Sequence, residues 1–241
     1  MEEAALVVDL VAELKGKLIV SCQAFPGEPL YGSEYMVALA KSAVQGGAGG
    51  IRANGAEDVR AIKAAVKVPI IGIYKRDYPG YAPRITPTVE DFQAILETGA
   101  DIIAVDATDR VHPGGVGLKE FLKQIRALTS KPIMGDISTL DEALIAEECG
   151  LDLIGTTLNG YTHSTAGQPE YEPNLDLLEA IVKSASIPVI AEGRIWEPSQ
   201  AREALERGAW AVTVGSAITR PWLITARFVD FMHLGDDTSR Q

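Results

Sequence analysis

The chain has 241 residues, of which 46% are hydrophobic and 23% charged, and this composition is typical of a globular protein with a large core. No apolar stretch approaches the roughly 18 residues of a membrane span, and the N-terminus carries acids where a signal peptide carries bases, so we expect a cytoplasmic protein that does not bind membranes. The net charge of −11, with no clustered basic run, argues against nucleic acid as a partner. The two cysteines, Cys22 and Cys149, lack the spacing of a zinc site and are predicted to be free thiols.

Two kinds of strand segment alternate along the chain after a predicted extra helix over residues 1–15. In one kind a helix ends at a glycine and a short strand follows, as in ILETGADIIAVDAT, AEECGLDLIGTTL and ALERGAWAVTVGSA. In the other kind a proline opens an apolar strand, as in VKVPIIGIYK, TSKPIMGDIS and ASIPVIAEGR. Together with GKLIVSCQ and AVQGGAGGIRAN they predict eight strands, near residues 17–23, 49–54, 69–75, 102–108, 132–138, 153–158, 188–194 and 211–217.

The segments between these strands have the periodicity of helices. A capping box from Thr88 to Asp91 opens one of them, and Pro198 lies in the first turn of another. Apolar strands that are each followed by a helix indicate a parallel sheet, and eight such units predict a (β/α)8 TIM barrel in one domain, residues 1–234. Residues 235–241 are predicted to be a disordered tail. A doubly wound sheet is the alternative, but the first strand lacks a G-x-G-x-x-G turn after it.

Polar residues stand at the C-terminal end of every predicted strand, where barrel enzymes place their chemistry. In chain order they are Ser21 and Gln23, Arg52 and Asn54, Lys75 and Arg76, Asp106 and Thr108, Asp136 and Ser138, Thr156 and Thr157, Glu192 and Arg194, and Gly215 and Ser216. Lys75 is expected to share the barrel mouth with Asp136 and Glu192, the group that a proton-transfer enzyme needs. The alternative is a ring of solvated strand ends that are held by ion pairs.

The three histidines do not favour a metal site. None of His112, His163 and His233 falls at a predicted strand end, and a metal-dependent barrel enzyme usually needs several imidazole or carboxylate ligands. We therefore predict a metal-free site. His112 and His163 lie in loops, where either a surface position or a substrate contact is expected.

The last two predicted strands are followed by small residues that precede a helix. The sequences AEGRI and VGSAITRP place exposed backbone N–H groups where they can bind a phosphate, and Arg220 can add a charge-assisted contact. The alternative is that these glycines only permit tight turns.

These motifs together resemble a known family. The segments LIVSCQA, GGIRANG, PIIGIYKRDY, ITPT, AVDAT, DISTLDEA, TTLNGYT, PVIAEGRI and VGSAITRP, between about residues 17 and 230, are similar to those of N-acylglucosamine-6-phosphate 2-epimerases. The resemblance implies that Lys75 and Glu192 are catalytic and that the phosphorylated sugar contacts Gln23, Arg52, Asp136, Thr157, Gly193, Arg194, Gly215, Ser216 and Arg220. Ser216 departs from the pattern, because the family often has a second glycine there.

The resemblance implies interconversion of N-acetylmannosamine 6-phosphate and N-acetylglucosamine 6-phosphate, in sialic acid and amino sugar breakdown. Such a reaction needs a base for the C2 proton and stabilisation of the enolate oxygen, and it needs no cofactor. We assign Lys75 as the base and leave open how it shares protons with Glu192. Rival interpretations are a Schiff-base isomerase or lyase that uses Lys75 and a noncatalytic phosphosugar sensor. The expected partner is the phosphorylated N-acyl hexosamine. The sequence leaves the oligomeric state open, and a homodimer is one of the states considered.

Overall fold

A computed structural model of the protein describes residues 10–233. The predicted tail at 235–241 lies outside the described residues, as does most of the predicted helix at 1–15, of which residues 10–13 are helical.

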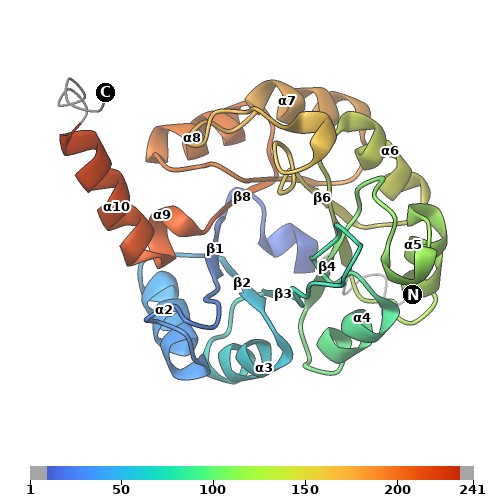
Figure 1. Ribbon diagram of the computed structural model, residues 1–241, viewed down its shortest axis with the longest axis horizontal. Helices are drawn as coiled ribbons and strands as arrows, with labels where there is room; N and C mark the ends of the chain where they lie inside the picture. Colours follow the sequence, from blue (N-terminus) through green and yellow to red (C-terminus); the bar gives the residue numbers. More distant parts are fainter. Residues whose placement is uncertain (1–9, 234–241) are drawn as a thin grey trace.

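Eight parallel strands form a closed barrel in the order of the sequence, with β1 paired to both β2 and β8 (Figure 1). The strands are β1 (Leu18–Cys22), β2 (Gly50–Asn54), β3 (Ile70–Ile73), β4 (Ile102–Asp106), β5 (Ile133–Asp136), β6 (Leu153–Gly155), β7 (Val189–Glu192) and β8 (Ala211–Val214). The (β/α)8 prediction is confirmed, and each strand lies within the range expected from the sequence. Several strands end earlier than predicted, so Lys75 follows β3 instead of ending it.

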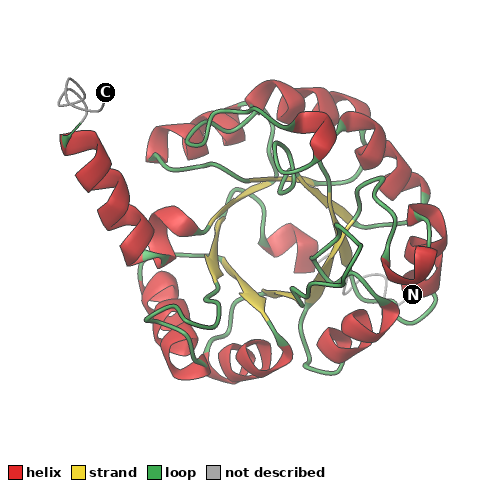
Figure 2. Cartoon of the chain, viewed as in Figure 1, coloured by secondary structure: helices red, strands yellow, loops and turns green. Residues whose placement is uncertain are grey.

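Helices surround the barrel, as Figure 2 shows. They are α2 (Ser33–Gln45), α3 (Ala56–Ala65), α4 (Val89–Leu96), α5 (Leu118–Arg126), α6 (Leu140–Glu148), α7 (Leu175–Ser184), α8 (Pro198–Glu206), α9 (Ser216–Thr219) and α10 (Pro221–Met232). Pro198 opens α8 as predicted. The capping box predicted at Thr88 is half formed: the Thr88 hydroxyl accepts from Asp91 N, but the Asp91 carboxylate accepts from that hydroxyl and not from Thr88 N. Each helix returns the chain to the same end of the barrel, so the loops after the strands converge at the other end.

The core has an outer layer between strands and helices and an inner layer inside the barrel. Alternate strand residues fill the inner layer, among them Ile19, Ile71 and Met134. Val11 and Leu14 belong to this inner cluster, and the indole of Trp210 donates a hydrogen bond to Val11 O at 2.8 Å. Residues 10–16 therefore close the N-terminal end of the barrel, and the opposite end stays available for a site.

The final helix, α10, departs from the pattern of the other helices. Figure 1 shows it projecting away from the barrel, and none of its residues is buried. Its apolar side chains Phe228, Phe231 and Met232 are between 66% and 76% exposed. None of the described helices is both long and apolar enough to span a membrane.

Candidate active site

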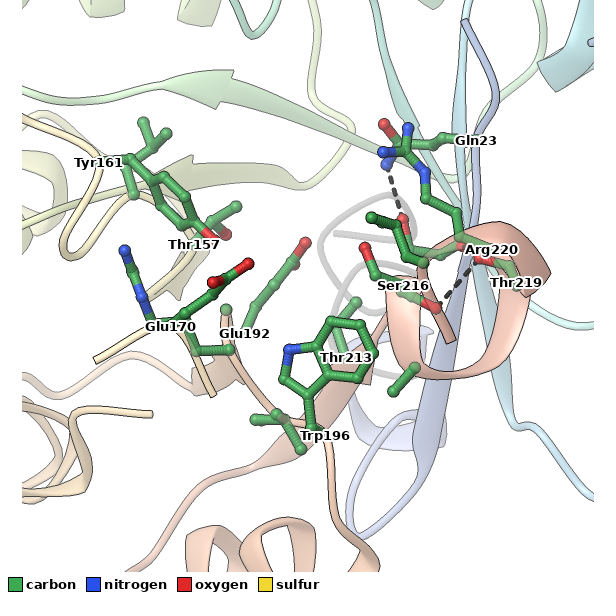
Figure 3. Close-up of a pocket in the computed structure, with 18 of the residues that line it drawn as sticks. Gln23, Thr157, Tyr161, Glu170, Glu192, Trp196, Thr213, Ser216, Thr219 and Arg220 are labelled. Carbon is green, nitrogen blue, oxygen red and sulfur yellow. Dashed lines mark hydrogen bonds between the residues drawn. The ribbon is translucent and has the colours of Figure 1, made fainter. Parts of the chain in front are cut away.

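A cavity of about 760 Å³ opens at the C-terminal ends of the strands. Most of the predicted site residues line it, namely Gln23, Lys75, Thr157, Glu192, Gly193, Arg194, Gly215, Ser216 and Arg220. Figure 3 shows Glu192 between Thr157 and Tyr161 on one side and Ser216 and Arg220 on the other. Barrel closure brings together residues that are far apart in the sequence.

The two remaining predicted residues, Arg52 and Asp136, lie buried beside this cavity. Arg52 donates from both terminal nitrogens to the Asp136 carboxylate, at 3.0 and 2.5 Å, and from Nη1 to Glu192 Oε2 at 2.8 Å. The Thr157 hydroxyl donates to Asp136 Oδ1 at 2.5 Å, the oxygen that also accepts from Arg52 Nη1. Burial alone would lower the pKa of Arg52, but the two carboxylates raise it above its ordinary value, so this guanidinium stays charged. One buried cation therefore fixes two carboxylates.

Glu192 is held through both its side chain and its backbone. Its carboxylate pairs with Arg52, and the Thr156 hydroxyl accepts from Glu192 N at 3.0 Å and donates to Glu192 O at 2.9 Å. Burial raises the pKa of Glu192, while the Arg52 charge opposes that shift. A carboxyl group with a raised pKa can take up and return a proton closer to neutral pH than an exposed one.

Lys75 enters the cavity without a carboxylate partner. No ion pair joins it to an acidic residue within the described part of the chain, because Arg52 takes the Glu192 carboxylate. The pKa of Lys75 is lowered to about 8, mainly by burial and next by the Arg52 charge, while the Glu192 charge raises it by less. The Glu192 charge favours the ammonium form of Lys75, but burial outweighs it.

The cations at the mouth share an aromatic ring. Phe25 lies with its ring centroid 5.5 Å from Lys75 Nζ and 5.0 Å from Arg220 Cζ. Arg220 also lies 3.4 Å from Glu28. Gly193 and Gly215 line the same region, and Gly193 has φ of 104°, a conformation that side-chain-bearing residues rarely adopt. Backbone and guanidinium groups at this end can therefore approach an anion closely.

Arg194 has a contact pattern that its motif did not indicate. Its guanidinium donates to Asn159 O at 2.5 Å and to Gly160 O at 3.1 Å, and it stacks over the Tyr161 ring at 4.1 Å. These bonds tie the loop after β7 to the loop after β6. A direct contact of Arg194 with the sugar stays a prediction.

His112 is not where the sequence led us to expect it. It is fully buried, with Nδ1 3.0 Å from Pro87 O and its ring stacked on Phe121 at 4.0 Å. Burial lowers the pKa of His112. The surface and substrate-contact expectations for this residue were therefore wrong, because an imidazole with an aromatic neighbour packs well inside a loop.

Sequence reasoning missed several residues that line the cavity. Phe25, Tyr161 and Thr213 face it, and the Thr213 hydroxyl is buried without a hydrogen-bond partner. Thr213 could have been found as the single hydroxyl in the apolar run AVTV, two residues before Gly215. Phe25 and Tyr161 lie in loops, where no periodic pattern predicts the direction of a side chain.

Comparisons with known proteins identify the family of the chain. A family model described as putative N-acetylmannosamine-6-phosphate epimerase matches residues 36–234. Proteins named putative N-acetylmannosamine-6-phosphate 2-epimerase are 52% identical in Caldanaerobacter subterraneus (93% of this chain, 94% of that protein) and 49% identical in Enterobacter sp. (90% and 92%).

Solved structures resemble the fold as well. The N-acetylmannosamine-6-phosphate 2-epimerase of Clostridium perfringens matches with a TM-score of 0.87 and 44% identity, over 92% of this chain and 96% of that one. A thiamine phosphate pyrophosphorylase of Pyrococcus furiosus matches with a TM-score of 0.59 and 21% identity, over 94% of this chain and 100% of that one. This likeness is one of fold alone. Because the family model matches residues 36–234 and a relative of 52% identity covers 93% of the chain, the chain belongs to the family of putative N-acetylmannosamine-6-phosphate epimerases.

Proposed function

We propose that this protein interconverts N-acetylmannosamine 6-phosphate and N-acetylglucosamine 6-phosphate by removing a proton from C2 and returning it to the opposite face. The observation that carries the proposal is the pair formed by a lysine of lowered pKa and a glutamate of raised pKa in one cavity. Perturbed acids and bases in a shared cavity are typical of proton-transfer sites. Family membership supplies the substrate class.

Lys75 is suited to act as the base at C2. With a pKa of about 8, roughly a tenth of it is neutral at pH 7, which is about 300-fold more than at the ordinary value of 10.5. Its lack of a direct carboxylate partner favours proton exchange with the substrate. Glu192 then positions the reacting sugar or moves protons during ring opening.

Arg52 and Asp136 are proposed to bind the amide and hydroxyl groups of the sugar. Because the two side chains already bond to each other, their contacts with the sugar either use atoms that have no hydrogen-bond partner or replace existing hydrogen bonds. The Nε–H of Arg52 is a buried donor without a partner. Gln23 lines the cavity, and its Oε1 is a buried acceptor without a partner.

Proton NMR of either hexosamine phosphate with the enzyme in heavy water tests the reaction. We expect the product epimer to carry deuterium at C2, without added NAD, because a lysine proton exchanges with solvent between turnovers. Absence of interconversion by the folded protein would overturn the proposal, and full retention of hydrogen over many turnovers would count against a solvent-exchanging base. An adduct trapped with borohydride would instead favour Schiff-base chemistry on Lys75.

The pH dependence tests the role of Lys75. If its neutral form is the base, kcat/KM rises with pH and levels off above about 8, the pKa to which burial lowers this residue. Lys75→Met keeps the stem but cannot carry a proton, so turnover should fall by about 10²-fold or more and the rise with pH should disappear. Initial rates between pH 6 and 9 measure both effects. Normal turnover by folded Lys75→Met would refute the assignment.

Arg220→Ala separates phosphate binding from chemistry. Loss of a charge-assisted contact costs about 1.5–3 kcal/mol, which is roughly 10- to 150-fold in binding. The loss should raise KM with kcat nearly kept, because phosphate is bound equally in the ground and transition states. Unphosphorylated N-acetylmannosamine is the matched comparison, since it lacks the group that Arg220 is proposed to hold. An equal loss for both sugars would mean that Arg220 supports the loop instead.

We propose that the protein forms a homodimer through α10. The exposed Phe228, Phe231 and Met232 give that helix an apolar surface that its own barrel leaves uncovered. Light scattering should give twice the chain mass for the wild type and a lower mass for Phe231→Asp. A monomeric wild type at micromolar concentration would contradict this proposal.

A cytoplasmic location and a single barrel domain over residues 1–234 are proposals that rest on the sequence. A phosphorylated sugar does not cross a membrane unaided, because its charge is costly to place in hydrocarbon, so enzyme and substrate should share a compartment. Cell fractionation with an antibody to this chain tests the location.

A further inference from the structure

The segment Ile85–Thr86 forms a wedge between the ends of β3 and β4. The ladder between these strands stops after Gly72 pairs with Ile103, although β3 continues to Ile73 and β4 to Asp106. Beyond that point the chain has made a loop over residues 76–84 and returned, so Ile85 bridges to Lys75 in the antiparallel sense. The two strands are thus separated next to Lys75.

Thr86 replaces the missing ladder with its own groups. Its N–H donates to Tyr74 O at 2.8 Å, and its hydroxyl accepts from Tyr74 N at 3.0 Å and donates to Ala104 O at 2.7 Å. Asp106 N donates to Ile85 O at 2.7 Å. The side chain of Thr86 therefore joins both strands, and its hydroxyl and backbone N–H together bind both backbone groups of Tyr74, the neighbour of Lys75.

Thr86 makes these contacts in an unfavourable backbone conformation. Its φ is 49°, and it is completely buried. A positive φ is a genuine outlier for a β-branched residue, and such strain concentrates at functional sites. Within residues 10–233 the other non-glycine residue of this kind is Arg194, two positions after Glu192.

Lys75 is fixed from its other side by β2. The Asn54 side chain accepts a hydrogen bond from Lys75 N at 2.7 Å. Asn54 is also the β2 residue that pairs with Ile73, the last residue of β3. The Thr156 hydroxyl likewise bonds to both backbone groups of Glu192, although Thr86 needs its own N–H as well as its hydroxyl to bind both groups of Tyr74. Both members of the acid–base pair thus have a backbone that is clamped by buried side-chain hydrogen bonds.

From this geometry we infer that Thr86 is a positioning residue for Lys75: its hydroxyl holds the strained wedge that directs the Lys75 amine into the cavity. The inference rests on the proposed function of Lys75 as the base. Without the hydroxyl, Tyr74 N and Ala104 O lose their shared partner, and the end of β3 is free to shift. A shift of about 1 Å at a reacting group can cost about 10²-fold in rate.

Two substitutions remove the hydroxyl in different ways. Thr86→Val keeps the side-chain shape and the backbone strain. Glycine adopts a positive φ without strain, so Thr86→Gly is the variant expected to fold. We expect kcat to fall by about 10- to 100-fold in both, with KM within about threefold of wild type, because the hydroxyl of Thr86 bonds to Tyr74 N and Ala104 O and to none of the groups proposed to hold the phosphate. Thr86→Ser should restore most of the rate lost in Thr86→Val.

Thr98→Val is the matched control. Thr98 is also buried, and its hydroxyl donates to Ile95 O at 2.6 Å and accepts from Ala100 N at 3.2 Å, at the opposite end of β4. Loss of the Thr98 hydroxyl should lower the melting temperature, as is also expected for Thr86→Val, but kcat should stay within about twofold of wild type. If Thr98→Val lowers kcat as much as Thr86→Val, or if a folded Thr86→Gly keeps the wild-type kcat, the inference is wrong.

A second readout does not depend on epimerase activity. NMR titration of ¹³C-methylated lysines, with the Lys75 signal assigned by its absence in Lys75→Met, reports the pKa of this amine directly. We expect a value near 8 in wild type and Thr98→Val and a higher value in Thr86→Gly, because a displaced amine regains water. An unchanged Lys75 titration in Thr86→Gly would overturn the inference. Inactivity of the wild type would instead count against the proposed function alone.

Discussion

The buried guanidinium of Arg52 is the interaction on which the site depends. It comes from β2 and binds Asp136 at the end of β5 and Glu192 at the end of β7, so one side chain crosses the barrel mouth and joins three strands. A buried charge is costly unless it is fully paired, and replacing such groups with apolar residues is often neutral or stabilising. Stability alone therefore gives little reason for this arrangement. Its consequence is that two carboxylates are held at fixed positions beside the cavity.

The same arrangement sets the state of Lys75. Because Glu192 is already paired with Arg52, the amine of Lys75 has a cation nearby and no direct carboxylate partner in the described part of the chain. Burial and the Arg52 charge both favour the neutral amine. A single cation thus separates the proposed base from the acid that would otherwise keep it protonated. This separation resolves the conflict that adjacent lysine and glutamate residues present when only their sequence positions are known.

Rigid supports surround these charges. Residues 10–16 close one end of the barrel through Trp210, so the cavity forms only at the end where the loops meet. The Arg194 guanidinium donates to carbonyl oxygens of the loop after β6. The Glu142 carboxylate accepts from the backbone N–H groups of Asp109, Ser138 and Thr139, in the loops after β4 and β5. The raised pKa that burial gives Glu142 is opposed by these same bonds. Loop positions that carry the chemistry are therefore held by buried polar side chains instead of by regular ladders.

The eight strands, the barrel and the residues at the strand ends follow from sequence patterns. Glycine after some helices and proline before the alternate strands are local signals that act within a few residues, so a chain can be divided into elements without its three-dimensional contacts. Once the elements are parallel and eight in number, their C-terminal ends must meet, which placed Lys75 and Glu192 in one cavity.

Only the tertiary structure decided how those residues are paired. The contacts of Arg52 join residues 84 and 140 positions apart, and the register of the closed barrel decides which carboxylate it reaches. The buried position of His112, the wedge at Thr86 and the outward direction of α10 are likewise set by loops and packing that leave no periodic signal. Local propensity fixes an element, whereas the direction of a side chain at its end depends on every neighbour that closure brings into contact.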